Sequence, residues 1–122
     1  MKWFSSHGGR FPLIVAETQG KVVGYCSLSS FRSSSGYATT AESSVYVHRD
    51  FRNRGIASIL MKEILDRARQ LKYHTIVACI AGGNDSSIKL HEKFGFKFSG
   101  RLAEVGLKFG NWQDDVFYVL II

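Results

Sequence analysis

Residues Glu42 to Leu71, ESSVYVHRDFRNRGIASILMKEILDRARQL, decide how this chain folds. Ser44 to His48 is rich in β-branched and aromatic residues and predicts a strand, while apolar residues recur at helical spacing from Ile56 onward. Between the two, Arg52 to Ala57 spell RxxGxA. The first amides of a helix lack partners within it, and glycine lets a ligand approach the backbone, so this turn is typical of a phosphate site. An ordinary strand-to-helix loop with solvated arginines is the alternative.

Length and composition are those of one soluble globular domain. The chain has 122 residues, 45% of them hydrophobic, and a single proline. Its sequence contains neither an apolar run long enough to cross a bilayer nor a signal-peptide core, so we expect a cytosolic protein without a membrane partner. Cys26 and Cys79 lie in apolar, strand-like segments, and we expect both to be reduced and buried, with a disulfide as the less favoured alternative.

The charge balance points to an anionic partner. The formal net charge is +6, from 16 Lys and Arg against 10 Asp and Glu. Basic residues are scattered apart from Arg49, Arg52 and Arg54, and an alternation of aromatic and basic residues of the RNA-recognition kind is missing from the sequence. A compact anionic ligand therefore fits better than nucleic acid, which stays a minor alternative.

The segments around the central stretch predict more strands. Leu13 to Glu17 and Lys21 to Phe31 form a hairpin, in which Gly24 indicates a bulge or a close backbone contact. Arg32 to Thr40 is a polar, serine-rich loop. After the helix, the apolar run His74 to Ile80 predicts a buried strand parallel to the strand before the helix, because strand, helix and strand form a right-handed crossover.

The last third of the chain predicts a helix and a hairpin. Asn84 is a good N-cap for a second helix from Asp85 to Phe94, with Gly95 at its C-terminus. Phe96 to Phe109 and Asp114 to Ile122 alternate enough to be two strands joined at residues 110–112. The whole is then one domain with a mostly antiparallel sheet and one parallel strand pair at its centre.

Four segments resemble the GNAT superfamily of N-acetyltransferases, and within it the phosphinothricin and methionine sulfoximine acetyltransferases. They are LIVAE followed by GKVVGY, AESSVYVHRDFRNRGIAS, NDSSIKLHEKFGF, and EVGLKFGNWQDDV near the end. The resemblance implies an α/β (α+β) fold of the GNAT acyl-CoA N-acyltransferase type, with a mixed sheet, a central splayed parallel strand pair and helices on the sheet faces. Such proteins begin with a strand and two helices. We expect domain 1–122 to lack them, to start near the end of the second helix at Trp3 and Phe4, and to leave a sheet edge exposed.

The resemblance also implies an acetyl-CoA cosubstrate, without a metal, bound where the two parallel strands splay apart. Backbone amides in the RxxGxA turn would bind the diphosphate, and the main chain of the preceding strand would pair with the pantetheine arm as a further strand does. Asn84 would contact the cofactor, with a plain helix N-cap as the alternative. The implied cofactor-binding residues are Val45, Tyr46, Val47, Arg52, Asn53, Arg54, Gly55, Ile56, Ala57, Asn84 and Ser87.

Two residues are the candidate catalytic groups. Glu42 matches the glutamate that the family uses as general base for the attacking amine; a solvated strand end is the alternative. His91 stands where many relatives carry a tyrosine that serves as general acid, and it shares a helical face with Ser87. A helix-packing histidine is the alternative for His91.

The acceptor side is less defined by sequence. Arg32 and Tyr37 match positions near the substrate carboxylate, which an arginine fork would suit, but Ala38 stands where relatives have an arginine. The resemblance implies a small amino acid or analogue as acceptor and a homodimer, in which Phe109 and Trp112 pack or line a pocket. A protein or peptide amine, or a non-catalytic module that binds acetyl-CoA, are the alternatives.

Overall fold

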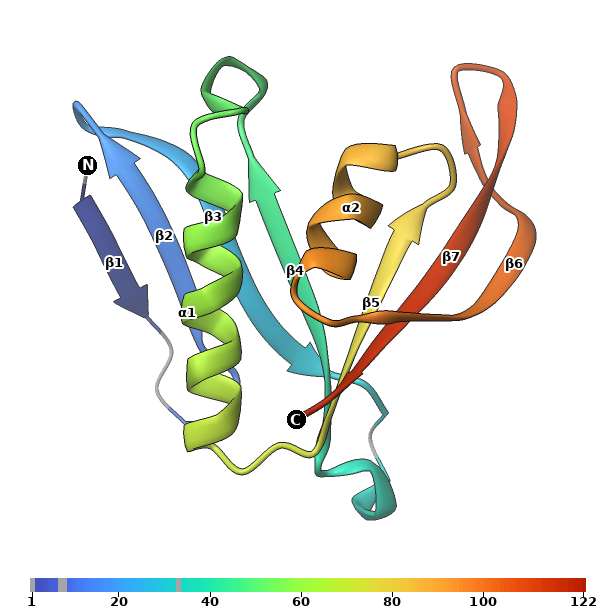
Figure 1. The fold of residues 1–122 in the computed structure, drawn as a ribbon, viewed down its shortest axis with the longest axis horizontal. Coiled ribbons are helices and arrows are strands. Elements are labelled where there is room, and N and C mark those ends of the chain that lie inside the picture. Colours follow the sequence, from blue (N-terminus) through green and yellow to red (C-terminus); the bar gives the residue numbers. More distant parts are fainter. Residues whose placement is uncertain (1, 7–8, 33) are drawn as a thin grey trace.

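The structure, a computed structural model, describes residues 2–6, 9–32 and 34–122. These residues form one seven-stranded sheet and two α-helices (Figure 1). The strands are β1 (Lys2–Ser6), β2 (Leu13–Thr18), β3 (Lys21–Ser30), β4 (Thr40–Val47), β5 (Thr75–Ala81), β6 (Lys97–Lys108) and β7 (Asn111–Ile121). The helices are α1 (Ile56–Gln70) and α2 (Asp85–Lys93), with short 3-10 turns η1 (Ser35–Tyr37) and η2 (Arg49–Phe51).

The sheet confirms the predicted mixture of strand directions. Its order is β1-β2-β3-β4-β5-β7-β6, and every neighbouring pair is antiparallel except β4 and β5. The parallel pairing runs from Thr40 opposite Thr75 to Ser43 opposite Ala78 and stops there, although β4 continues to Val47. Figure 1 shows β4 and β5 diverging beyond that point. The C-terminal half of β4 therefore lacks a partner strand on its β5 side.

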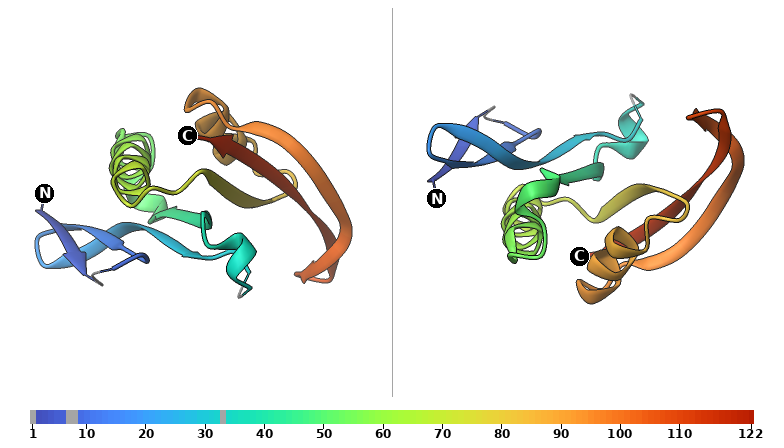
Figure 2. Two further views of the ribbon diagram at one scale, coloured as in Figure 1. Left: turned by 90° about the horizontal axis from the view of Figure 1, so that it is seen from below. Right: turned by 90° about the horizontal axis from the view of Figure 1, so that it is seen from above.

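Both helices cover the same face of the sheet, as the two views of Figure 2 show. α1 buries a stripe at helical spacing that includes Leu60, Ile64 and Ala68, each 0% exposed. On the sheet, this stripe joins one core with Ala41 of β4 and Ile76 of β5. Alternate residues of those strands, Glu42 among them, point to the other face. Among the described residues, no helix covers that second face.

Gly24 confirms the predicted close backbone contact. A Cβ added there would stand 2.8 Å from the carbonyl oxygen of Tyr46 and 3.2 Å from Cδ1 of Leu60. The register between β2 and β3 also shifts next to this residue, between Ala16 and Glu17. Gly24 thus lets β3 lie against the part of β4 that has lost its other neighbour.

Three expectations from the sequence are wrong. Trp3 and Phe4 lie in strand β1, which pairs with β2, and not near the end of a helix, so the edge of β2 is covered. The last hairpin turns at Phe109 and Gly110, whose φ angles of 51° and 76° suit a tight two-residue turn, so Asn111 and Trp112 already belong to β7. Cys79 is exposed, because its side chain points to the face without helices, whereas Cys26 is buried. Both thiols are free.

Candidate functional site

The open edge of β4 is the first part of the site. The amide of His48 donates to the carbonyl of Val23 on the β3 side. Because backbone groups alternate along a strand, those of Val47 and Val45 point to the other side, where β5 has diverged. The carbonyl of Val47 accepts a hydrogen bond of 3.2 Å from Nε of Arg52. The backbone groups of Val45 and the amide of Val47 remain directed into the gap, where an extended ligand can pair with them.

The turn after β4 is the second part. The backbone is held by His48, whose Nδ1 accepts from the amide of Asp50 at 3.2 Å. Asn53 and Gly55 then take left-handed conformations, with φ of 62° and 78°. Gly55 is the N-cap of α1 and has no side chain to accept from the first helical amides, and an added Cβ there would meet nothing within 4 Å. The predicted turn and the helix that follows it are therefore confirmed, and an anion at this turn stays a prediction, which the missing side-chain cap suits.

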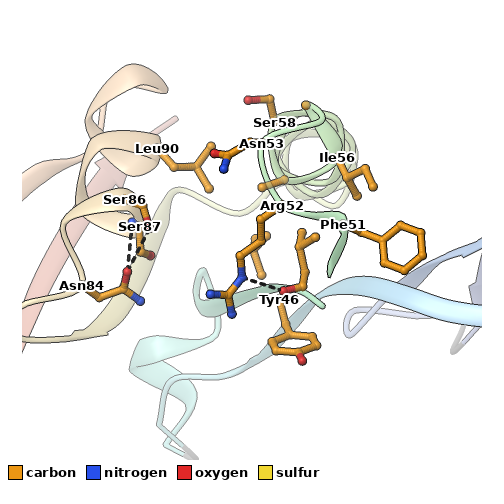
Figure 3. A pocket seen from close by; sticks show the side chains of 14 residues that line it. Tyr46, Phe51, Arg52, Asn53, Ile56, Ser58, Asn84, Ser86, Ser87 and Leu90 are labelled. Carbon is orange, nitrogen blue, oxygen red and sulfur yellow. Dashed lines mark hydrogen bonds between the residues drawn. The ribbon is translucent and has the colours of Figure 1, made fainter. Parts of the chain in front are cut away.

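A cleft of about 450 Å³ joins these two parts and reaches α2. Figure 3 shows Arg52 and Asn53 on one side of it and Asn84, Ser86 and Ser87 on the other. Of the residues predicted to bind the cofactor, all except Arg54 line this cleft, namely Val45, Tyr46, Val47, Arg52, Asn53, Gly55, Ile56, Ala57, Asn84 and Ser87. Arg54 instead lies with its guanidinium 5.1 Å from the ring centre of Phe51.

Sequence reasoning missed four residues of the lining, Phe51, Ser58, Ser86 and Leu90. A signal was present for three of them. Ser58 follows RxxGxA in the first turn of α1. On α2, Ser86 directly precedes the predicted Ser87, and Leu90 follows Ser87 by three residues, on the same helical face. Phe51 lies in η2, which the sequence did not predict as an ordered turn.

Asn84 is a helix cap whose side chain also borders the cleft. Its Oδ1 accepts from the amide of Ser87 at 3.3 Å and from Oγ of Ser86 at 3.2 Å. The N-cap that the sequence predicts is therefore confirmed. A contact with a cofactor stays a prediction, which this geometry allows because the amide nitrogen of Asn84 is not needed for the cap.

Glu42 lies close to the point where the strands separate, but on the sheet face opposite the helices. It is paired with Val77, one residue before the last β4–β5 pair, and its side chain is half-buried. Although the Cys79 side chain is exposed, desolvation by its neighbours raises the pKa of its thiol to about 11, and the charges of Asp115 and then Glu42 add to this. The Glu42 carboxylate is therefore near that thiol. Glu42 does not line the cleft. Glu42 therefore lies beside the point where β4 and β5 part, on the face opposite the cleft lining from α1 and α2.

His91 is a buried packing residue of α2. It is 5% exposed, its ring meets that of Phe96 edge to face at 5.0 Å, and it is absent from the cleft lining. Its Nδ1 lies 2.7 Å from the carbonyl oxygen of Ser87, which can only accept, so Nδ1 carries the proton in the neutral ring. Burial lowers the pKa of His91, which favours this neutral form. A catalytic role for His91 stays a prediction that requires the cleft to extend beneath α2.

Arg32 and Tyr37 come together beside the start of β4. The Arg32 guanidinium lies 5.2 Å from the ring centre of Tyr37 and 5.3 Å from that of Phe31. Arg10 holds this loop against the core, because it donates to the carbonyls of Ala38 at 3.1 Å and of Leu71, at the end of α1, at 2.8 Å. The two predicted acceptor residues thus form one cluster at the opposite end of β4 from the glycine turn before α1.

The described residues contain neither a membrane-spanning helix nor a metal-ion cluster. No helix among them has the length and apolar character to cross a bilayer. Across residues 2–6, 9–32 and 34–122, no cluster of three or more His, Cys, Asp or Glu side chains is arranged to hold a metal ion. The site described above is built instead from backbone amides, hydroxyls and arginine.

The fold and the cleft together define a class: an α/β protein in which a glycine turn opens a helix beside a splayed parallel strand pair. Comparison with known sequences identifies it further. The sequence profile of the Acetyltransferase (GNAT) family matches residues 1–96, and the chain belongs to this family of acetyltransferases. The relationship implied by the four sequence segments is therefore confirmed.

Relatives of known name or structure agree with the family assignment. The L-methionine sulfoximine/L-methionine sulfone acetyltransferase of Pseudomonas aeruginosa strain PAO1 is 40% identical over 120 residues, 97% of this chain and 70% of that protein. The crystal structure of a ribosomal-protein-alanine N-acetyltransferase from Brucella melitensis has a TM-score of 0.86 and 44% identity, covering 92% of this chain and 69% of that one. A phosphinothricin acetyltransferase from Sinorhizobium meliloti, crystallised with acetyl-CoA, has a TM-score of 0.86 and 34% identity, with coverage of 92% and 61%.

Proposed function

We propose that this acetyltransferase moves an acetyl group from acetyl-CoA to the amine of a small amino acid or analogue, of the kind represented by methionine sulfoximine and phosphinothricin. The observation that carries the proposal is the open edge of β4 beside the uncapped N-terminus of α1. These two features offer hydrogen-bond partners for an extended amide-bearing arm and for a diphosphate in one continuous cleft. The names of the relatives supply the acceptor class.

The residues present fit such a donor. Gly55 offers no side chain to the first amides of α1 and has open space beside it, which suits a diphosphate, and Val45 and Val47 leave backbone groups for the pantetheine arm. Arg52 has one nitrogen engaged by the Val47 carbonyl and keeps the other donors of its guanidinium for a phosphate or a carbonyl oxygen. When bound, acetyl-CoA would supply an activated acetyl group as a thioester.

Glu42 is the proposed general base. An amine must lose a proton to attack a thioester carbonyl, and a carboxylate that is half-buried near the reacting atoms can accept that proton directly or through water. Its place one residue before the strands separate, on the face without helices, means that the amine would approach from that face while the donor occupies the helix side. Backbone amides of the open β4 edge are the candidates to stabilise the oxyanion.

Arg32 and Tyr37 are the proposed acceptor residues. A guanidinium beside a phenol suits an α-carboxylate, because the guanidinium can make two parallel hydrogen bonds and the phenol a third. Their loop precedes β4 by only a few residues, so an acceptor held there by its carboxylate would extend along the face that carries Glu42.

The test is acceptor-dependent release of the coenzyme A thiol. We expect release when L-methionine sulfoximine or phosphinothricin is added to the protein with acetyl-CoA. Loss of a general base typically costs about 100-fold or more, so Glu42→Gln should lower kcat by at least about 100-fold and leave acetyl-CoA affinity within about twofold. Absence of release with every member of an amino-acid panel, despite acetyl-CoA binding, would refute the small-amine proposal.

A second candidate keeps the reaction and changes the acceptor to a protein or peptide amine. The observation in its favour is the relative named for ribosomal-protein alanine acetylation. Peptides with a free N-terminal alanine, added to the same thiol assay, separate the two acceptor classes. A module that binds acetyl-CoA without turnover would show binding by calorimetry for both wild type and Glu42→Gln, and thiol release for neither.

We also propose a cytosolic homodimer. The β6–β7 hairpin carries large apolar side chains that are more than half exposed, and such a surface is typical of an interface. They are Phe98, Val105, Leu107, Phe109 and Trp112. Sedimentation at micromolar concentration would test the dimer, and Leu107→Lys at the hairpin would dissociate it.

A further inference from the structure

A lysine connects the two helices beside the cleft. Lys93 is the last residue of α2, and its Nζ donates to Oγ of Ser58 in the first turn of α1 at 3.3 Å. Ser58 lines the cleft, and Leu90, which shares a helical face with Lys93 at a spacing of three, lines it too. Figure 3 places Ser58 and Leu90 on facing sides of the same opening. The Lys93 ammonium therefore stands at the rim of the cleft, between the two helices.

The cleft lining contains few charged side chains, so a lysine beside it changes the local charge. Of the fourteen lining residues, Arg52 is the one with a full charge, and none is a carboxylate. Nε of Arg52 is engaged by the Val47 carbonyl, and Arg54 stacks on the ring of Phe51 and is not itself part of the lining. Lys93 thus brings a second cation close to the free amides of α1, from the α2 side.

The Lys93 ammonium can donate further hydrogen bonds. An ammonium has three donors, of which Ser58 takes one, and a hydroxyl that accepts can still donate its own proton. Nζ also lies 5.9 Å from the ring centre of the neighbouring Phe94, a contact that uses none of its donors. A hydrogen bond between exposed side chains contributes little to stability. The contact between Lys93 and Ser58 is therefore poorly explained as a means of holding the two helices together.

We propose that Lys93 and Ser58 bind a phosphate of the nucleotide end of the cofactor, an inference that rests on the proposed use of acetyl-CoA. A flexible ammonium is well suited to a phosphate as a point charge, and a hydroxyl and the nearby helix amides complete the set of donors. Coenzyme A offers two sources of that chemistry, its diphosphate and its 3′-phosphate. Lys93 is then a cofactor-binding residue contributed by the C-terminus of α2.

The experiment compares three probes on three lysine variants by calorimetry: coenzyme A, 3′-dephospho-coenzyme A and pantetheine. Lys93→Met removes the charge and keeps the chain length, and Lys93→Arg keeps a cation. Lys21→Met, at the exposed start of β3, is the matched control for the loss of one positive charge. We expect Lys93→Met to bind coenzyme A about tenfold more weakly, a loss of about 1.4 kcal/mol. Lys93→Arg and Lys21→Met should stay within about twofold of wild type.

The probes then locate the phosphate. A tenfold loss that persists with 3′-dephospho-coenzyme A assigns Lys93 to the diphosphate, and a loss that disappears with it assigns Lys93 to the 3′-phosphate. Either result supports the proposal, and pantetheine binding should not change.

Three results would overturn the proposal. They are coenzyme A affinity within about twofold of wild type in Lys93→Met, an equal loss with pantetheine, or an equal loss in Lys21→Met. Wild-type protein that binds no coenzyme A would refute the proposed function as well, whereas normal wild-type binding without an effect of Lys93 would refute this inference alone.

Discussion

Asn84 has a structural role in α2 and a proposed role at the cofactor, and two substitutions separate them. Its Oδ1 caps the helix through the amide of Ser87, and its side-chain nitrogen is free to donate into the cleft. Asn84→Ala removes both the cap and the donor. Asn84→Ser keeps a capping oxygen, because serine is as good an N-cap as asparagine, and removes the amide nitrogen.

The expected magnitudes follow from these contacts. Losing the cap costs about 1 kcal/mol. At about 2.1 cal/mol/K per residue, the unfolding entropy is roughly 0.26 kcal/mol/K for this chain of 122 residues, so Asn84→Ala should lower Tm by about 4 °C. Asn84→Ser should stay within about 1 °C of wild type. A neutral hydrogen bond to the cofactor is worth about 1 kcal/mol, so both variants should bind acetyl-CoA about fivefold more weakly.

Thermal melting followed by circular dichroism measures the first effect, and calorimetry with acetyl-CoA measures the second. An unchanged Tm in Asn84→Ala would contradict the capping role. Full acetyl-CoA affinity in Asn84→Ser, with reduced affinity in Asn84→Ala, would mean that the amide nitrogen makes no contact and that the alanine variant acts by loosening α2. Full affinity in both would remove Asn84 from the cofactor site.

Three further predictions use urea unfolding. Gly24→Ala should lower the unfolding free energy by about 1–3 kcal/mol, because the new Cβ collides with a backbone carbonyl, whereas Gly100→Ala, with open space around it, should not. Ser43 is buried and its Oγ lacks a partner among the described residues, so Ser43→Ala should leave stability unchanged or raise it by about 1 kcal/mol; a clear loss would show that the hydroxyl is bonded. Burial lowers the folded-state pKa of His91, so the unfolded chain binds its proton first and stability falls as pH drops below about 6.5. The unfolding free energy of His91→Gln should therefore fall less than that of wild type at low pH. The same pH dependence in both proteins would contradict the burial argument.

The parts of the fold that the sequence predicted are those set by local pattern. The periodicity after Gly55 predicted a helix from Ile56 onward, where α1 begins, and the order of strand, helix and strand predicted that β4 and β5 are parallel. Ten of the eleven predicted cofactor residues line one cleft because a turn and two neighbouring elements bring them together. Such contacts are close in sequence or fixed by strand pairing.

The errors come from features that local pattern does not encode. Cys79 belongs to a continuous apolar run, in which alternation gives no sign of which face the helices cover. The position of Phe109 in the last turn depends on a left-handed φ, which is unusual for that residue type. Lys93 and Ser58 are 35 residues apart, and their contact follows from the packing of two helices that the sequence predicts only separately.

The gap between β4 and β5 has a kinetic consequence. In the proposed function, acetyl-CoA would occupy the cleft on the helix side and the amine would approach Glu42 from the other side, so neither substrate would have to leave before the other arrives. We therefore expect both substrates to be bound together and the acetyl group to pass directly from the thioester to the amine. Initial rates at several fixed concentrations of one substrate should give intersecting double-reciprocal lines rather than the parallel lines of a ping-pong exchange.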